Sequence, residues 1–547
     1  MDQQEKSKYK IIQPLMLSAC IAVGMMVGFK MNDKPENSLV SIEDYPTEGQ
    51  MMTGRVEELI RFIENKYVDK VDGQQLISEA LHGVFSVLDP HSVYLTPDDT
   101  ENVNDQMDGV YNGIGIENYM IDDTVHISNV LKNTPAEKSG LKAFDRILSI
   151  DGKNVAGKKI DYGEIRTMLK KDVGSVVKLE VLRKSRLFHI SLMVGKVEVR
   201  TVNSVLLKDI NTVLIKIDRF GENTYREFMD DVEKHFTENN AKHLILDLRD
   251  NPGGFLPEAT NILCQIFAEK DRLLLYTEGR NNKKNEYKTN GKRFFDIDQV
   301  VVLIDENSAS ASEIIAGAIQ DWDRGLIIGR RSYGKGLVQE QYNLTNGGAI
   351  RLTVARYYTP SGRSIQRDYS DRVVYEADYQ DRYQNGDLFN KDSTLIKNGG
   401  KYFTQILKRE VAGSGGISPD VFIAMDTIFR DEYYFSVSYL LPEFAFRYAS
   451  KYQNNVPKDQ KSFAAWQLPD LAYVEFKSFL KYHAENEAAI SAQSFGRLKK
   501  EIKNQIGKYL FNRNGISSEP ENDIFISEAI QVIKNKKTAS DFLLKVN

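Results

Sequence analysis

The sequence predicts a multidomain chain of the α/β + α class, and three observations predict it. At the usual domain size, 547 residues correspond to about three to five domains. Between residues 203 and 366, strand-like apolar runs alternate with helical runs, which is typical of an α/β domain. After residue 426 the pattern is mostly helical, with aromatic residues spaced among charged ones.

Residues 1–30 predict a membrane anchor. Residues 11–29 carry no charge and can just span a bilayer core of ~30 Å. Basic residues precede this stretch: Lys6, Lys8 and Lys10. They favour a cytoplasmic N-terminus, which predicts a single-pass protein of the cell inner membrane with its bulk in the periplasm. The alternatives are a lipoprotein signal cleaved before Cys20 and a cleaved secretory signal.

A linker and a small helical domain are predicted next. Residues 31–50 are polar with Pro and Gly, as in linkers. In the domain predicted at 51–108, four apolar residues share one helix face: Val56, Leu59, Ile60 and Ile63. Such a domain could also mediate self-association, so a homo-oligomer is one expectation for the partners of this chain.

Three further regions follow. Residues 109–198 contain short β-rich runs, turns and one helix around 161–170, and they have the length of one domain. Residues 199–425 form the α/β region, and the stretch 367–400 within it is predicted to be an irregular insertion rich in Tyr, Asp and Asn. Residues 426–547 form a mostly helical C-terminal region.

Charge and cysteine content limit the partners and cofactors. The chain has 72 Lys and Arg against 77 Asp and Glu, a net charge of −5. This balance argues against nucleic acid as the main partner, because phosphate binding needs a basic surface. The two cysteines, Cys20 and Cys264, lie in different contexts, so neither a disulfide nor a zinc site is expected. We expect Cys264 to be an ordinary core residue, and we expect no cofactor and no metal.

A serine cluster indicates nucleophilic chemistry. Residues 308–312 read SASAS and lie where a buried strand turns into a helix. A serine hydroxyl at such a turn lies beside the free N–H groups of the helix start, which can stabilise an oxyanion. Ser310 and Glu313 also fit the S-x-x-E pattern of a capping box. Spacing alone does not choose among Ser308, Ser310 and Ser312.

Lys335, between Gly334 and Gly336, is the candidate general base. No histidine lies between His243 and His483, and a desolvated lysine can lose its proton near neutral pH. One alternative is a phosphate-binding GxxxxGK loop, but Gly336 stands where Ser or Thr should hold Mg²⁺. A Ser–His–Asp enzyme that uses His243 is a second alternative.

A glycine-rich turn supplies the third element. Residues 241–254 read AKHLILDLRDNPGG, a buried strand followed by a polar turn. Gly253 and Gly254 allow main-chain amides to approach a ligand closely, so a second oxyanion donor could come from here. The alternative is a plain strand-to-helix turn, which is common in α/β folds.

Together these stretches resemble the C-terminal processing peptidases, also called tail-specific proteases, of the Ser–Lys type. The resemblance runs from about residue 56 to about residue 420. It is carried by YVDKVDGQQLISEALHGVFSVLDPHSVYL, LILDLRDNPGG, SASASEIIAGAI, SYGKGLVQ and RYYTPSGRSIQ. The combination is far more specific than any single piece.

The resemblance assigns roles to residues of the α/β serine protease core. It makes Ser310 the nucleophile and Lys335 the base, which Gln339 orients. The oxyanion donors are the amides of Ala311 and of Gly253 or Gly254.

The resemblance also makes the region 109–198 a PDZ domain. Its carboxylate-binding loop maps to Gly113, Ile114, Gly115 and Ile116, and TPAEKSGLKAFDRILSIDG follows at a fitting distance.

The expected function is therefore that of an anchored serine endopeptidase working through an acyl-enzyme. Its expected substrates are proteins outside the cytoplasm, cleaved in their C-terminal regions, with free C-terminal tails captured by the PDZ domain. The alternatives are a non-catalytic PDZ scaffold that binds protein C-termini and a nucleotide-driven machine that uses the glycine–lysine loop.

Overall fold

The computed structural model describes residues 50–281, 283–390, 400–426, 437–483, 492–511 and 520–541. The chain divides into two compact units, Met1–Thr100 with Gln339–Thr353, and Glu101–Val338 with Val354–Asn547. The expected anchor at 1–30, with Cys20, lies outside the described residues. Within the part that is described, no helix is both long and apolar enough to cross a membrane.

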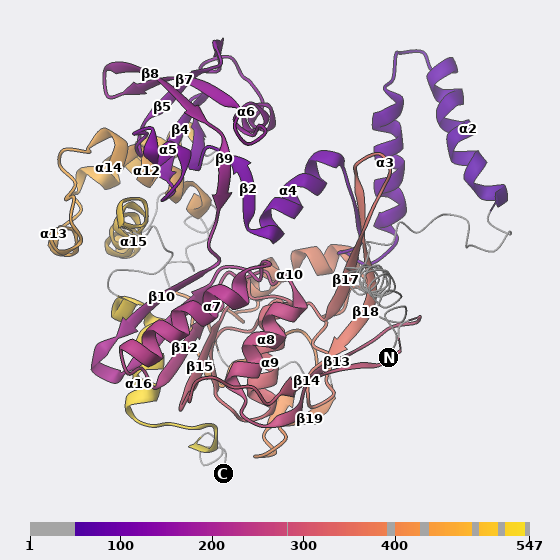
Figure 1. The fold of residues 1–547 in the computed structure, drawn as a ribbon, viewed down its shortest axis with the longest axis vertical. Coiled ribbons are helices and arrows are strands. Elements are labelled where there is room, and N and C mark those ends of the chain that lie inside the picture. Colours follow the sequence, from indigo (N-terminus) through magenta and orange to yellow (C-terminus); the bar gives the residue numbers. More distant parts are fainter. Residues whose placement is uncertain are drawn as a thin grey trace, which may run out of the picture. The chain divides into compact units, whose positions relative to one another are not determined.

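The first unit holds a helical hairpin and a small β element. Helices α2 (Gln50–Lys66) and α3 (Gly73–Ser86) are followed by strand β1 (Val93–Leu95) and the start of α4 (Pro97–Asp108). Strand β1 pairs antiparallel with the beginning of β18 (Ala349–Tyr358). Strand β18 also pairs with β17 (Leu337–Asn343), and Figure 1 shows these two strands side by side. The apolar stripe predicted on α2 is largely exposed, with Val56 at 52% and Leu59 at 58%.

The β-rich region forms a domain of the second unit. Its elements are β2 (Val110–Gly113), β3 (Ile116–Ile121), β4 (Thr124–Val130), α5 (Pro135–Lys138), β5 (Arg146–Ile150), β6 (Lys153–Asn154), α6 (Tyr162–Leu169), β7 (Val176–Arg183), β8 (Arg186–Met193) and β9 (Gly195–Glu198). The main sheet has the order β3-β4-β5-β7-β8, while β2 pairs with β9. The helix expected near 161–170 is α6, and Asp161 caps it by accepting the N–H of Gly163.

The α/β region is built on a six-stranded sheet. Its order is β10 (Val202–Leu207), β11 (Thr212–Ile217), β12 (His243–Asp247), β15 (Val300–Ile304), β16 (Leu326–Gly329) and β21 (Val421–Phe422). All neighbours are parallel except β10 and β11, which are antiparallel. Helices α7 (Thr224–Glu233), α8 (Leu256–Ile266) and α9 (Ala311–Asp321) connect these strands.

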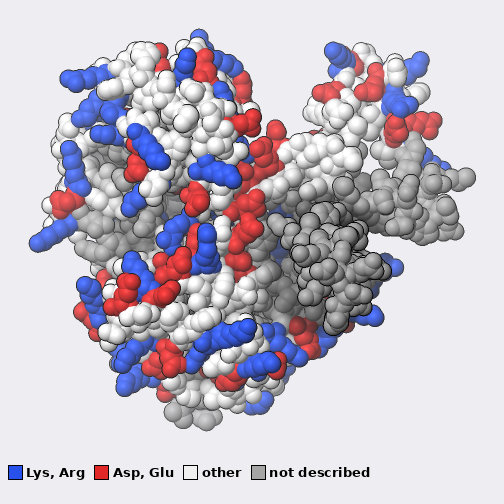
Figure 2. Space-filling model, viewed as in Figure 1, with Lys and Arg blue, Asp and Glu red and all other residues white. Residues whose placement is uncertain are grey.

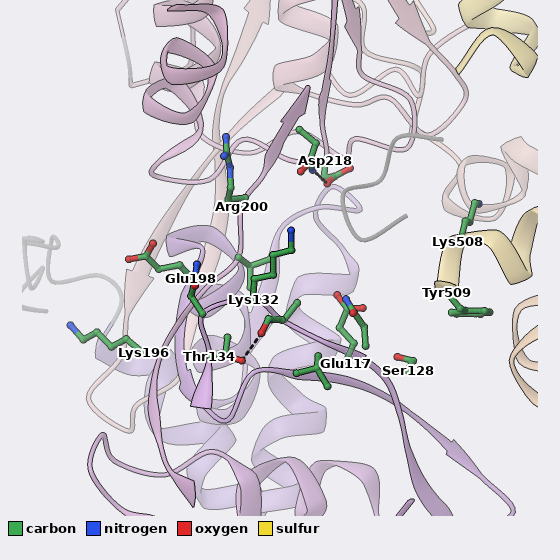
Figure 3. Close-up of a pocket in the computed structure, with 16 residues that line it drawn as sticks. Glu117, Ser128, Lys132, Thr134, Lys196, Glu198, Arg200, Asp218, Lys508 and Tyr509 are labelled. Atoms are coloured by element: carbon green, nitrogen blue, oxygen red, sulfur yellow. Dashed lines mark hydrogen bonds between the residues drawn. The ribbon is translucent and has the colours of Figure 1, made fainter. Parts of the chain in front are cut away.

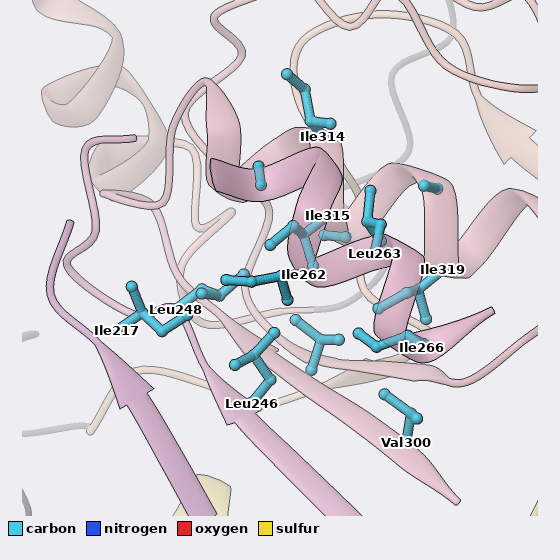
Figure 4. Close-up of a cluster of buried hydrophobic side chains, with 14 of the residues drawn as sticks. Ile217, Leu246, Leu248, Ile262, Leu263, Ile266, Val300, Ile314, Ile315 and Ile319 are labelled. Carbon is cyan, nitrogen blue, oxygen red and sulfur yellow. The ribbon is translucent and has the colours of Figure 1, made fainter. Parts of the chain in front are cut away.

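Alternating side chains of this sheet enter two separate cores. In β12, Leu246 faces α8 and α9, whereas Ile245 faces the opposite side. Figure 4 shows Leu246 beneath Ile262 of α8 and Ile315 of α9. The opposite side is covered by α16 (Ile524–Lys534) from the C-terminal region, so both faces of the sheet are buried.

A second sheet and an insertion complete this region. Strands β13 (Lys270–Glu278) and β14 (Asn285–Asn290) pair antiparallel, and β13 also pairs with the end of β18. Strands β19 (Lys401–Phe403) and β20 (Glu410–Ala412) form a hairpin. The expectation of an irregular insertion at 367–400 is wrong in part. Helix α10 (Arg372–Gln384) occupies much of it, because Asp371 caps its first turn by accepting two main-chain N–H groups.

The C-terminal region is helical where it is described, as predicted. It contains α12 (Leu441–Lys451), α13 (Gln460–Ala465), α14 (Leu471–His483) and α15 (Ala492–Phe511). Short 3-10 helices lie at Ser438–Leu440 and Pro520–Asn522. In the α/β region, a 3-10 helix lies at Lys208–Ile210 and a π-helical turn at Lys234–Glu238. Phe446 of α12 contacts the rings of Phe144, Tyr119 and Tyr509, which joins the C-terminal helices to the β-rich domain.

Charged residues of both signs share the surface. On the face shown in Figure 2, Lys and Arg are interspersed with Asp and Glu, in keeping with a formal net charge of −5. Cys264 lies in the core at 6% exposure, as expected.

Candidate active site

The serine cluster lies at the carboxyl edge of the parallel sheet. It follows β15 and continues into α9, whose N-cap is Ser310. Ser310 has φ 53° and ψ −113°, a conformation that costs an L-residue on the order of 1–3 kcal/mol. A serine held in such a strand-to-helix turn presents its hydroxyl at the edge of the sheet, as the nucleophile of α/β hydrolases does.

The three serines of the cluster have different surroundings. Ser308 and Ser312 are fully buried. The Ser308 hydroxyl donates to the carbonyl oxygen of Leu248 at 2.8 Å, and the Ser312 hydroxyl donates to that of Asn251 at 3.0 Å. Ser310 is only half-buried. Spacing left open which of the three serines reacts. Their burial and hydrogen bonds favour Ser310 as the reactive hydroxyl.

Glu313 connects the two candidate catalytic residues. Its side chain is fully buried, and its Oε2 accepts the main-chain N–H groups of Ser310 and Lys335, each at 2.9 Å. Its Oε1 accepts the N–H of Gly334 at 2.7 Å and the hydroxyl of Ser332 at 2.6 Å. Burial raises the pKa of Glu313 to about 7, while these four hydrogen bonds act in the opposite direction.

Tyr357 makes a second connection. Its hydroxyl lies 2.9 Å from the carbonyl oxygen of Lys335 and 3.2 Å from that of Ser310, and its side chain is 1% exposed. Burial, with the nearby Glu313 carboxylate, raises the pKa of Tyr357 well above its ordinary value, so the hydroxyl stays a donor. The main chains of Ser310 and Lys335 are thus held by the same two side chains. Lys335 itself is half-buried.

The glycine-rich turn packs directly against Ser310. Gly253 has φ +99°, and a Cβ there would lie 2.7 Å from the Ser310 Cβ and 3.0 Å from the Ala311 nitrogen. Gly254 has φ +144°, and a Cβ there would lie 2.2 Å from the Phe220 carbonyl oxygen. Only glycine fits at both positions.

The two glycine amides are not equivalent. The N–H of Gly253 already donates to the Asn251 Oδ1 at 2.9 Å. Within the described residues, the N–H groups of Gly254 and Ala311 have no acceptor. Ala311 opens α9, where the first N–H groups of a helix lack internal partners. Gly254 and Ala311 are therefore the better-placed pair of oxyanion donors.

The expected carboxylate-binding loop lines a groove. Residues 113–116 border a cavity of about 230 Å³ together with Ile165 and Leu169 of α6. The N–H groups of Ile114 and Gly115 have no acceptor among the residues that the structure describes. The loop can therefore donate to a ligand, as β-strand addition of a peptide tail requires.

Comparison with known proteins identifies the family. A model of peptidase family S41 matches residues 211–373, a PDZ domain model matches residues 112–194, and a model of the activating protease CtpB N-terminal domain matches residues 17–99. The carboxy-terminal processing protease CtpB of Bacillus subtilis is 32% identical over 61% of this chain and 70% of that relative. The carboxy-terminal-processing protease of Bartonella bacilliformis is 33% identical over 62% of this chain and 79% of that relative. The chain belongs to peptidase family S41.

This S41 peptidase is thus a serine-type carboxy-terminal processing protease with a PDZ domain. Among solved structures it is similar to the photosystem II D1 C-terminal processing protease, at 24% identity over 58% of this chain and 90% of that chain, with a TM-score of 0.33. The family assignment rests on the sequence matches and not on this likeness.

Gln339, the residue expected to orient Lys335, lies in β17 and belongs to the first unit. Its side-chain amide donates to the carbonyl oxygen of His91 in the same unit. The orienting role of Gln339 stays a prediction.

Two alternative chemistries disagree with the geometry. His243 opens β12 at the amino edge of the sheet, opposite Ser310, and burial lowers its pKa. A phosphate-binding loop needs a helix after its lysine, but strand β17 follows Lys335. The N–H groups of Gly334 and Lys335 are also bound to Glu313. We therefore exclude His243 as the base and this loop as a nucleotide site.

Several supporting residues could not be recognised from the sequence. Glu313 was visible only as a helix cap, and Tyr357 only as part of the RYYTPSG stretch. Arg382 of α10 donates to the carbonyl oxygens of Arg331 and Ser332 at 2.9 Å, which supports the loop before Lys335. No local signal marks Arg382, because its role depends on where α10 packs.

A larger cavity of about 730 Å³ contains neither Ser310 nor Lys335. It lies where the PDZ domain, β10 and α15 meet. Figure 3 shows Lys508 and Tyr509 of α15 beside it, with Lys132 and Glu117 of the PDZ domain. Basic and acidic side chains are mixed around it, so it defines no ligand class. Among the described residues, no three His, Cys, Asp or Glu side chains could together hold a metal ion.

Proposed function

We propose that this S41 peptidase is a Ser–Lys endopeptidase with Ser310 as nucleophile and Lys335 as general base. The observation that carries this proposal is the shared attachment of both residues to Glu313 and Tyr357. This attachment keeps the main chain of the serine beside that of the lysine. The half-buried position of Lys335 supports its role, because partial desolvation favours the uncharged amine.

The reaction follows from these positions. Uncharged Lys335 accepts the hydroxyl proton of Ser310 while its Oγ bonds to the scissile carbonyl carbon. The amides of Ala311 and Gly254 donate to the oxyanion, each contributing about 3 kcal/mol in comparable sites. The C–N bond then breaks, and Lys335 returns the proton to the leaving amine. Water attacks the acyl-enzyme with Lys335 again taking the proton, which releases the acid and restores Ser310.

The proposed substrates are extracytoplasmic proteins, cleaved in their C-terminal regions. The groove beside residues 113–116 would take the free tail, because its unpaired main-chain N–H groups suit a terminal carboxylate. We further propose that Gln339 orients Lys335 and that residues 1–30 anchor the chain in the inner membrane, facing the periplasm. The uncharged stretch 11–29 supports the anchor.

Self-association is a further proposal about the partners of this chain. The exposed apolar side chains of α2 support it, including Phe62 at 65%. Analytical ultracentrifugation of the wild-type chain and of a Phe62→Ser variant tests it. A monomer at every concentration would contradict it.

The catalytic assignment is tested by substitution and labelling. Ser310→Ala and Lys335→Ala should each abolish cleavage of a protein with an apolar tail. Ser312→Ala is the matched control, because its hydroxyl bonds the main chain and should not react. A serine-reactive probe should label Ser310 in the wild-type chain. Full activity of Ser310→Ala would overturn the assignment, and a chain that neither cleaves nor takes up the probe would favour a PDZ scaffold.

A further inference from the structure

Two residues that line the PDZ groove each have a buried polar side-chain atom without a partner. These atoms are Nε of Arg219 and Oδ1 of Asn118, and neither has a hydrogen-bond partner within the described residues. Leaving such a donor or acceptor unpaired costs about 1–3 kcal/mol. Their presence in one groove indicates a ligand that supplies both an acceptor and a donor.

The other basic residues of the groove already have acidic partners. Lys170 contacts Asp105 at 2.5 Å and Glu101 at 2.6 Å, and Arg166 lies 3.7 Å from Asp105. Within the described part of the chain, Arg219 forms no ion pair. The carboxylate of Asp218, its neighbour in sequence, lies 3.8 Å from the amine of Lys216. Among these cations of the groove, Arg219 is therefore the one that can accept an anionic ligand without losing a partner.

Arg219 comes from the protease core and not from the PDZ domain. It follows β11 and precedes Phe220, whose N–H donates to the Gly253 carbonyl oxygen at 2.9 Å. The Phe220 carbonyl oxygen in turn accepts the N–H of Phe255 at 2.8 Å. A ligand held by Arg219 is thus bound by a residue whose neighbour in sequence, Phe220, is hydrogen-bonded to the glycine-rich turn of the active site.

We propose that Arg219 is a substrate-binding residue that holds a carboxylate of the captured tail. The proposal rests on tail capture by this groove, as proposed above. A guanidinium suits this ligand, because it can donate two parallel hydrogen bonds to one carboxylate. Asn118 accepts an N–H group from the same peptide, as expected of a residue on the strand that the peptide extends.

The carboxylate that Arg219 holds can belong to either of two parts of the substrate, which have the same chemistry. One is the free C-terminus of the substrate, and the other is an acidic side chain near that end. The N–H groups of Ile114 and Gly115 are available to the terminal carboxylate in either case. The test must therefore vary the two carboxylates separately.

The experiment measures peptide binding to the full chain. The parent protein is Ser310→Ala, which leaves the peptides intact, and Arg219→Gln is added to it. Four fluorescent peptides combine a free or amidated terminus with Glu or Gln at the third position from the end. Arg186→Gln is the matched control, because Arg186 is exposed on β8 and does not line the groove. Thermal unfolding of each variant checks that it is folded.

Arg219→Gln should weaken binding of the peptide that has both a free terminus and Glu roughly tenfold or more, as expected for a charge-assisted pair. It should also remove the dependence of the affinity on one of the two carboxylates, either the free terminus or the Glu side chain. The carboxylate whose removal no longer weakens binding is the one that Arg219 holds. Arg219→Lys should recover part of the affinity. If Arg219→Gln leaves the affinity ratios among the peptides unchanged, the role of Arg219 is refuted while tail capture stands. If no peptide binds the parent protein, tail capture fails and this inference fails with it.

Discussion

The Glu313 carboxylate accepts the main-chain N–H of Lys335 at 2.9 Å through its Oε2. The same oxygen accepts the N–H of Ser310, so one atom fixes the distance between two main-chain segments. The side chain of Glu313 is fully buried. The positions of the proposed nucleophile and base therefore depend on the ability of Glu313 to accept four hydrogen bonds.

Replacing Glu313 by Gln should lower kcat and leave KM nearly unchanged. An amide keeps one acceptor oxygen, so some of the four donors lose their partner, at about 1–3 kcal/mol for each. If a similar amount is lost in the transition state, kcat should fall about 10- to 100-fold. Steady-state cleavage of a fluorogenic tail peptide measures this.

The matched control is Glu227→Gln. Glu227 also accepts several donors, the N–H groups of Thr201 and Val202 among them, but it belongs to α7. It should lose stability and keep its kcat. Equal kcat losses in the two variants would mean that Glu313 acts on the fold and not on the positions of Ser310 and Lys335.

Glu313 should also give stability an unusual pH dependence. Burial raises its pKa from the ordinary 4.5 to about 7 in the folded chain, so between these values the folded state binds more protons than the unfolded state. Its contribution to stability is therefore full below about pH 4.5 and is lost as the pH rises to about 7. The unfolding temperature of the wild-type chain minus that of Glu313→Gln should be larger at pH 5 than at pH 8. A difference that stays constant or grows with pH would contradict this.

The sequence predicted secondary structure better than it predicted tertiary contacts. Strand and helix alternation is a local signal, so the sheet around β12 and the helix α6 could be anticipated. The family resemblance selected Ser310, but spacing alone could not. Ser308 and Ser312 differ from it in their burial and in their bonds to Leu248 and Asn251, which are distant in sequence. Helix α16 had a helical pattern, but no pattern states which surface a helix covers.

Phe525 should be essential for the attachment of α16 to the core. It is 7% exposed, and the guanidinium groups of Arg249 and Arg330 lie 4.6 and 5.1 Å from its ring centre. Phe525→Ala should lower the free energy of unfolding by about 3–5 kcal/mol. Ile524→Ala is the control on the same helix, since Ile524 is 64% exposed. Denaturant unfolding in the Ser310→Ala background measures both, and similar losses would show that α16 is not packed on the sheet through Phe525.

A comparison of Gly253 with Gly174 separates the effect of backbone strain from that of steric displacement. Gly253 has φ +99° and Gly174 has φ +91°, so an alanine at either position is strained by a similar amount. A Cβ at Gly174 meets no atom within 4 Å, whereas a Cβ at Gly253 would lie 2.7 Å from the Ser310 Cβ. Gly174→Ala should therefore lower stability and keep kcat.

Gly253→Ala should lower stability and also displace Ser310 and the Ala311 amide, which lies 3.0 Å from the new Cβ. We expect its kcat to fall at least about 100-fold, because loss of a single oxyanion donor costs that much in comparable enzymes. Labelling by a serine-reactive probe should slow in parallel, since the probe meets the same hydroxyl and the same amide. If Gly253→Ala and Gly174→Ala retain equal kcat, the glycine-rich turn does not set the position of Ser310, and the assignment of Gly254 as an oxyanion donor loses its basis.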